Sequence, residues 1–255
     1  MTFIKSASGA GPRPANLGTR RPSGASLLGS MILLAALASA QSIPRMPNGK
    51  PNLNGVWQHP YVPDMSKDGK DQKGAGPLPF TPWGENNFKT YDPANFDYTG
   101  HCLPFGLMRS INVGGYPIQI MQNDQYVALL FEQNTWFHVI YSDGRERPKD
   151  LDPTWFGTSF GKWDGDTFVV DTIGFNGKTR LDTIGHPHTD ALHLTERYQL
   201  TDPQHIAYEM TIDDSKAYTK PWKNTRVFTR MKPGEELIEY SCEENNRDFT
   251  QGHIK

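Results

Sequence analysis

Short runs of β-branched and aromatic residues dominate the chain after Tyr116 and define its fold class. The runs recur about every ten residues, and turn sequences such as Asp164-Gly165-Asp166 separate them. Sequential strands without intervening amphipathic helices are typical of antiparallel barrels and sandwiches, and short local connections favour the barrel. We therefore predict an all-β, lipocalin-like antiparallel barrel of about eight or nine strands. The expected strands are residues 117–121, 126–131, 136–141, 159–163, 167–173, 192–200, 205–212, 226–231 and 236–242.

The preceding segment, from Gln41 to Gly115, has a different composition. It is rich in proline, glycine and asparagine, and it contains one candidate strand at 53–58. Pro82 can begin a helical turn, because proline is tolerated at the first helical position. We expect residues 41–115 to form an N-terminal arm that packs on a barrel domain over residues 116–255.

The N-terminal sequence has the features of a signal peptide. Basic residues, including Arg20 and Arg21, precede an apolar run at 27–37, and Ala38-Ser39-Ala40 fits the small-x-small cleavage rule. Residues 1–40 are therefore predicted to be removed, which places the mature chain in the periplasm or outside the cell. The apolar run is short for a membrane span, so no stable span is expected after cleavage. The arginine pair leaves both the general and the twin-arginine export routes open.

Composition and missing motifs exclude several function classes. The 255-residue chain has a formal net charge of -2, so it lacks the basic field that attracts nucleic acid. It has no G-x-G-x-x-G after a predicted strand, no phosphate-binding Walker loop and no G-x-S-x-G elbow. Nucleotide-binding enzymes and α/β-hydrolases are therefore disfavoured, and a small-molecule partner is expected. The sequence leaves the oligomeric state open.

Three of the eight histidines fall between Gly185 and His193, and we call residues 185–193 the histidine window. His186 and His188 flank Pro187, which restrains His186 to extended backbone, so both imidazoles can face the same way. His193 could complete a three-histidine site for zinc, copper or iron, with a position left for substrate. The alternative is a polar connection whose histidines hydrogen-bond to backbone or water.

Carboxylates near this window are candidates for proton transfer. Strand alternation over residues 192–200 places Glu196 in an apolar row and His193 on the opposite face. Burial would raise the pKa of Glu196 and suit it to general acid–base catalysis. The alternatives are an ion pair with a nearby Arg or Lys, or a position near the exposed end of the strand. Asp190 and Arg197 complete the candidate catalytic set, and Glu196 and His193 could share a site only through a bulge.

Aromatic residues could line a substrate pocket near the same window. Trp155, Tyr218 and Trp222 are the candidates, because aromatic rings stack on sugars and on other rings. Such rings are also common in a plain hydrophobic core, and the sequence leaves both interpretations open.

Two cysteines, Cys102 and Cys242, lie far apart in the chain. An oxidising compartment permits a disulfide between them. Two free thiols are the alternative, and a catalytic pair of Cys102 with His101 is a further one. That pair is disfavoured, because sequence neighbours on a strand point to opposite sides.

Several stretches resemble a family of exported proteins of environmental bacteria. The resemblance rests on residues 163–176 and 240–245, on the Gly185–Arg197 sequence GHPHTDALHLTER, and on the Thr211–Trp222 sequence TIDDSKAYTKPW. It covers most of the chain after the predicted signal peptide. It implies export and a single domain, and it assigns no catalytic residue.

These patterns lead to two main functional hypotheses. The first is an exported metal-dependent hydrolase or lyase that acts on a small aromatic or carbohydrate-derived molecule at the histidine window. A metal-free version would use proton transfer between histidine and carboxylate. The second is a lipocalin-like protein that binds an apolar small molecule without catalysis. A structural role in surface assembly is a weaker third hypothesis.

Overall fold

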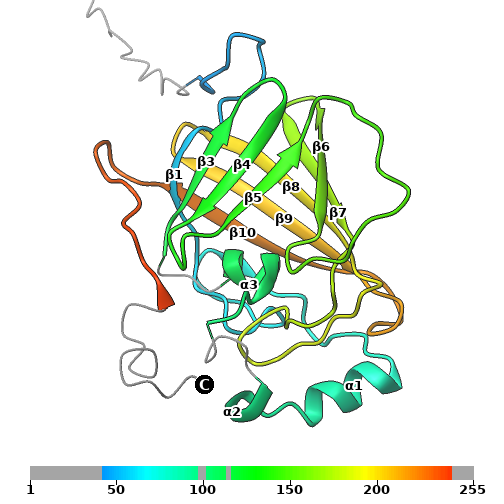
Figure 1. The fold of residues 1–255 in the computed structure, drawn as a ribbon. Helices are drawn as coiled ribbons and strands as arrows, with labels where there is room; N and C mark the ends of the chain where they lie inside the picture. Colours follow the sequence, from blue (N-terminus) through cyan, green and yellow to red (C-terminus); the bar gives the residue numbers. More distant parts are fainter. Residues whose placement is uncertain (1–41, 97–101, 113–115, 243–255) are drawn as a thin grey trace, which may run out of the picture. The chain divides into compact units, whose positions relative to one another are not determined.

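The computed structural model describes residues 42–96, 102–112 and 116–242, and the predicted signal peptide at 1–40 lies outside them. Nine strands close into a barrel, in the order β1-β3-β4-β5-β6-β7-β8-β9-β10 and back to β1 (Figure 1). A short tenth strand, β2, pairs with Thr225 and Arg226 of β10, whereas β1 pairs with Thr229 and Arg230 of the same strand. The predicted β-barrel is therefore confirmed. The strands are β1 (Gly55–Gln58), β2 (Gln72–Lys73), β3 (Ile118–Gln122), β4 (Tyr126–Phe131), β5 (Phe137–Tyr141), β6 (Thr158–Asp164), β7 (Thr167–Ile173), β8 (His193–Asp202), β9 (His205–Asp213) and β10 (Trp222–Arg230).

One pair of neighbouring strands departs from the predicted antiparallel arrangement. β5 and β6 are parallel, with Ile140 opposite Ser159, whereas the other neighbours in the barrel are antiparallel. The reason is the connection at 142–157, which is long enough to return the chain to the end of the barrel where β5 began. Parallel neighbours need a crossover of about a dozen residues or more, whereas antiparallel neighbours need only a tight turn.

The strand that closes the barrel comes from the segment expected to be an arm. β1 pairs with both β3 and β10, and it occupies the place expected for residues 236–242. Within 236–242 the structure has only an isolated bridge from Tyr240 to Gln133, so the prediction of a strand there is wrong. The candidate strand at 53–58 thus belongs to the barrel wall.

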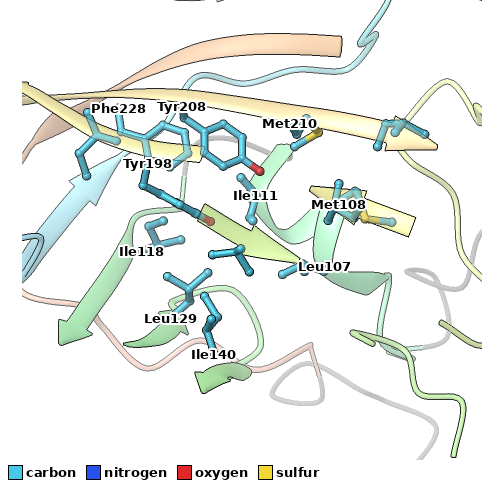
Figure 2. Packing of buried hydrophobic residues seen from close by; sticks show 14 of the residues in the cluster. Leu107, Met108, Ile111, Ile118, Leu129, Ile140, Tyr198, Tyr208, Met210 and Phe228 are labelled. Atoms are coloured by element: carbon cyan, nitrogen blue, oxygen red, sulfur yellow. The ribbon is translucent and has the colours of Figure 1, made fainter. Parts of the chain in front are cut away.

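The barrel interior is filled by side chains. Inward-facing residues of β8, β9 and β10 meet the three fully buried side chains of α3 (Gly106–Asn112), namely Leu107, Met108 and Ile111. Figure 2 shows these three side chains in the same buried cluster as Tyr208 and Met210. An interior space bounded by Leu53, Ile120, Val127, Leu129, Ile140, Phe168 and Tyr198 is too small to admit a water molecule. This part of the core therefore has no room for a ligand.

Helix α1 (Pro82–Lys89) is fixed to the loop that follows β9. Thr81 caps the helix, since its hydroxyl accepts the Gly84 amide at 3.0 Å, and the Thr81 amide donates to the Ala217 carbonyl at 2.9 Å. Gly84 packs so closely on Ala217 that any Cβ would collide with its carbonyl oxygen. A second helix, α2 (Pro93–Phe96), follows α1. These contacts place one face of α1 next to the histidine window.

The two cysteines form a disulfide, Cys102–Cys242, across 140 residues. This bond rules out the free-thiol alternative, and it leaves no thiol for the proposed pair with His101, which itself lies outside the described residues. Within the residues that the structure describes, no helix is both long and apolar enough to cross a membrane.

Candidate functional site

The histidine window begins on a tight hairpin. Arg180 and Pro187 form an antiparallel bridge, and the Leu181 amide donates to the His186 carbonyl at 2.9 Å. Gly185 turns the chain with φ of 95°, and a Cβ there would collide with the Tyr91 ring. The hairpin therefore presents the two histidines that flank Pro187 to different surroundings.

His186 is paired with a buried carboxylate. Its Nδ1 lies 2.6 Å from Oδ2 of Asp182, which also accepts the Met65 amide at 2.8 Å. The His186 ring stacks on Phe88 of α1, with 4.7 Å between ring centroids. The His186 ring is thus held between the Asp182 carboxylate and the Phe88 ring of α1.

Asp64 completes a group of three potential metal ligands. One carboxylate oxygen each of Asp64 and Asp182 and one ring nitrogen of His186 all lie within 4.8 Å of one another. Asp182 and His186 are buried, and Asp64 is half-buried. This group, which we call the Asp64 cluster, could hold a metal ion, because carboxylate oxygen and imidazole nitrogen are both common metal ligands.

His188 has both ring nitrogens engaged. Its Nε2 accepts from the Thr179 hydroxyl at 2.6 Å, so its Nδ1 carries the proton that is donated to the Thr189 carbonyl at 3.1 Å. Burial lowers the pKa of His188 to about 4. The imidazole is therefore neutral at pH 7 and bonded to the protein through both nitrogens.

His193 lies on the outer face of the barrel. It is exposed and pairs with Asp171, a carboxylate that also binds Arg147. The structure therefore does not bring His186, His188 and His193 together, and the predicted three-histidine site is not formed. Of the three, His188 has the backbone hydrogen bond that the alternative of a polar connection predicts, His193 pairs with a carboxylate, and His186 belongs to a potential metal site.

Glu196 points into the barrel, as strand alternation predicts. Oε1 accepts the hydroxyls of Tyr198 and Tyr208 at 2.8 and 2.7 Å, and Oε2 has no hydrogen-bond partner among the described residues. Burial raises the pKa of Glu196, and the hydrogen bonds from Tyr208 and Tyr198 together with the charge of Arg226 only partly oppose this shift. The expected rise in pKa is confirmed. The β8 bulge lies at Leu200–Asp202, too far along to turn His193 to the same side.

The other predicted residues do not share one environment. Tyr218 and Trp222 are buried in the core, and the Tyr218 hydroxyl donates to the Pro187 carbonyl at 2.8 Å. Arg197 lies on the outer face of β8 and donates to Asp164 at 3.2 Å. Asp190 is exposed and pairs with Lys216 at 2.6 Å. Trp155 lies 5.9 Å from the Lys178 ammonium, measured to its ring centroid.

Part of the histidine window lines a groove of about 750 Å³. We call it the Trp83 groove, because the indole of Trp83 is 47% exposed at its edge. The groove has the size of ligand pockets in proteins. Its walls come from α1, from residues 176–180 and 188–190, and from the loop after β9. It is lined by Trp83, Asn87, Asn176, Gly177, Lys178, Thr179, Arg180, His188, Thr189, Asp190 and Lys216.

Comparisons with known proteins do not assign this groove. No protein-family model matches the chain, and no curated protein matches it. The functional interpretation therefore depends on the chemistry of the groove and of the Asp64 cluster.

Sequence reasoning found only part of this site. It selected His188 and Asp190, which line the groove, and His186, which belongs to the Asp64 cluster. It missed Trp83, Arg180 and Asp182. Asp182 offered a weak signal, since it lies four residues before His186 in the chain. Trp83 offered none, because the fold alone brings α1 beside the window.

Proposed function

We propose that the Trp83 groove binds a small organic molecule, aromatic or carbohydrate-derived. The observation that supports this is the combination in one groove of an exposed indole with amide, hydroxyl and charged side chains. Ligand sites typically offer a flat apolar surface together with a few polar groups that fix orientation. Asn87 and Asn176 supply both donors and acceptors, which suits hydroxyl groups on a ring.

Binding receives more support from the geometry than catalysis does. His188 is neutral with both nitrogens engaged, and Lys216 lowers the pKa of Asp190 by hydrogen bonding and charge. A general acid or base works best with a pKa near the working pH. Glu196, the third candidate, is enclosed in the barrel core. The chemistry of a hydrolase or lyase would therefore have to come from a bound metal.

We further propose that the Asp64 cluster binds a divalent metal, with zinc or iron best suited to its mixed imidazole and carboxylate donors. Asp182 is completely buried, and a carboxylate removed from water needs compensating positive charge. A cation would supply this charge, and it would replace the hydrogen bond between His186 Nδ1 and Asp182 Oδ2. The metal would also connect the loop at Asp64 to the hairpin that borders the groove.

The metal assignment predicts specific zinc uptake. Purified protein loaded with zinc chloride and dialysed should retain about one equivalent, measured by inductively coupled plasma mass spectrometry. Asp64→Asn should lose most of it, because a neutral amide is a poor zinc ligand, and its half-buried loop position should preserve the fold. His193→Ala, a control in the predicted but unformed site, should retain zinc. Equal uptake by Asp64→Asn and the wild type would refute the assignment.

The groove assignment predicts that the exposed indole contributes to affinity. Trp83→Ala should weaken binding of ring-bearing molecules by about two- to twelvefold, because stacking adds roughly 0.5–1.5 kcal/mol. Isothermal titration calorimetry with a panel of monosaccharides and phenolic compounds would measure this loss. Phe137→Ala is the matched control, since Phe137 is 67% exposed and does not line the groove. A panel in which no compound binds, or an unchanged affinity in Trp83→Ala, would argue against the groove.

We also propose that the protein acts after export, in the periplasm or outside the cell. The sequence of the first 40 residues and the resemblance to exported proteins of environmental bacteria support this location. The Cys102–Cys242 disulfide is a further support, because such bonds persist in non-reducing compartments.

A further inference from the structure

Helix α1 contacts the Asp64 cluster and the Trp83 groove through different residues. The Phe88 ring stacks on the imidazole of His186, a member of the cluster, with 4.7 Å between ring centroids and 23° between ring planes. Trp83 and Asn87 of the same helix line the groove, which none of the three potential metal ligands lines. A change at the cluster can therefore reach the groove through α1, although the two candidate sites share no residue.

The helix is held by different contacts near its two ends. Near the N-terminal end, Gly84 packs against the Ala217 carbonyl, and this contact fixes α1 to the loop after β9. Near the C-terminal end, Phe88 contacts the imidazole of His186. A displacement of that imidazole would therefore tilt the C-terminal half of α1, which carries Asn87 at the groove wall.

Metal binding would require such a displacement. Donor atoms around a tetrahedral zinc ion lie about 3.3 Å apart, because each is about 2.0–2.1 Å from the metal. In the structure, His186 Nδ1 lies only 2.6 Å from Asp182 Oδ2. The two atoms would have to separate before both could bind one ion. Because the ring lies between Asp182 and Phe88, this movement would press it toward Phe88.

The ion would also restrain the hairpin itself. It would join Asp64, in the loop after β1, to Asp182 and His186 of the hairpin. The hairpin continues into residues 188–190, which line the groove. Two walls of the groove, α1 and residues 188–190, would then lose conformational freedom before a ligand arrives. A ligand that binds afterwards has less ordering to impose, and its affinity rises.

We propose that metal binding at the Asp64 cluster tightens ligand binding in the Trp83 groove, and that Phe88 is the positioning residue that connects the two. This inference rests on the proposed function of both sites, and it adds the regulation of one by the other. Coupling between two binding sites is reciprocal, so a groove ligand should strengthen zinc binding by the same factor.

Hydrogen exchange followed by mass spectrometry tests the coupling without a groove ligand. One equivalent of zinc chloride at pH 7.5 should slow exchange of the α1 amides by about fivefold in the wild-type protein. Phe88→Ala should bind zinc equally well but lose most of this protection, because alanine favours the helix and removes the ring. Phe88→Tyr keeps the ring and should retain the protection. Asp64→Asn, which lacks a ligand, should show none.

Isothermal titration calorimetry with phenol and with glucose tests the effect on the groove. Zinc should raise the affinity of the wild-type protein for at least one of these probes by about fivefold. The gain should be absent in Phe88→Ala and present in Phe88→Tyr. A merely structural role of Phe88 would instead lower the affinity of Phe88→Ala equally with and without zinc.

The outcomes separate the coupling from the two sites on which it rests. Zinc that binds without changing α1 exchange or probe affinity would overturn the coupling and leave both sites. Zinc-dependent tightening that persists in Phe88→Ala would overturn the role of Phe88. If no zinc binds, the metal assignment fails and the inference fails with it. If neither probe binds with or without zinc, the groove assignment and the inference both fail.

Discussion

Acidification should unfold the barrel between about pH 6 and pH 4. Three buried histidines, His59, His138 and His188, each have a pKa lowered to about 4, and burial is the largest cause in each case. In the unfolded chain the same groups titrate near pH 6.5. The stability from keeping them neutral is therefore complete above about pH 6.5 and is lost as the pH falls toward 4.

The size of this effect is comparable to the whole stability of a domain. A shift of one pKa unit corresponds to about 1.4 kcal/mol, so each histidine contributes about 3 kcal/mol and the three together on the order of 10 kcal/mol. Typical domains are stable by roughly 5–15 kcal/mol. Charging these imidazoles would cost much of the total, because burial disfavours the charged form of each ring.

Urea unfolding followed by circular dichroism at pH 7.5, 6, 5 and 4.5 would measure this loss. His188→Gln should lower the dependence of the unfolding free energy on pH by about one third, whatever its effect on stability at pH 7.5. His205→Gln is the control, since His205 is partly exposed and pairs with Asp202 near the surface. An unfolding free energy that stays constant from pH 7.5 to 4.5 would contradict the prediction.

Removing the disulfide should produce the second large effect. The bond joins Cys102 to Cys242 and closes a loop of 140 residues. In the loop-entropy description, such a constraint on the unfolded chain contributes about 5 kcal/mol. The double variant Cys102→Ser, Cys242→Ser should therefore be less stable by several kcal/mol, measured by urea unfolding at pH 7.5.

Reduction provides the matched control for this substitution. Wild-type protein kept in dithiothreitol should unfold at the same urea concentration as the double variant, because both lack the crosslink but retain the remaining contacts. The double variant itself should be insensitive to the reductant. A loss of less than about 1 kcal/mol in either case would mean that the bond does not stabilise the barrel through its long loop.

Most of the fold prediction came from the alternation of apolar and polar residues in the strands and from the residue types in the turns. The β6–β7 hairpin was predicted within one residue, because Asp164-Gly165-Asp166 supplies the positive φ of its turn, which is 59° at Gly165. β10 was predicted to begin four residues too late and to end one residue too late. It begins at Trp222, but buried Asn224 and Arg226 interrupt the apolar alternation that marks a strand.

The sequence did not indicate that the polar residues Asn224 and Arg226 of β10 face the barrel interior. Asn224 donates to the Met65 and Lys73 carbonyls at 3.1 Å, and Arg226 donates to the Ile111 carbonyl at 3.2 Å. These partners come from β2, α3 and the loop before β2, which are distant in the chain. The same limit applies to the Trp83 groove, because its walls are assembled from segments that only the closed barrel and the anchored α1 bring together.

The parallel β5–β6 pair has a consequence for how this barrel can be altered. Strand direction reverses at every antiparallel neighbour, so a closed ring must contain an even number of such reversals. Nine strands give nine neighbouring pairs, and eight are antiparallel only because β5 and β6 run the same way. The parity of the ring thus makes the long connection at 142–157 indispensable. Replacing it with a hairpin would require adding or deleting a whole strand elsewhere, so strand number and this one loop can change only together.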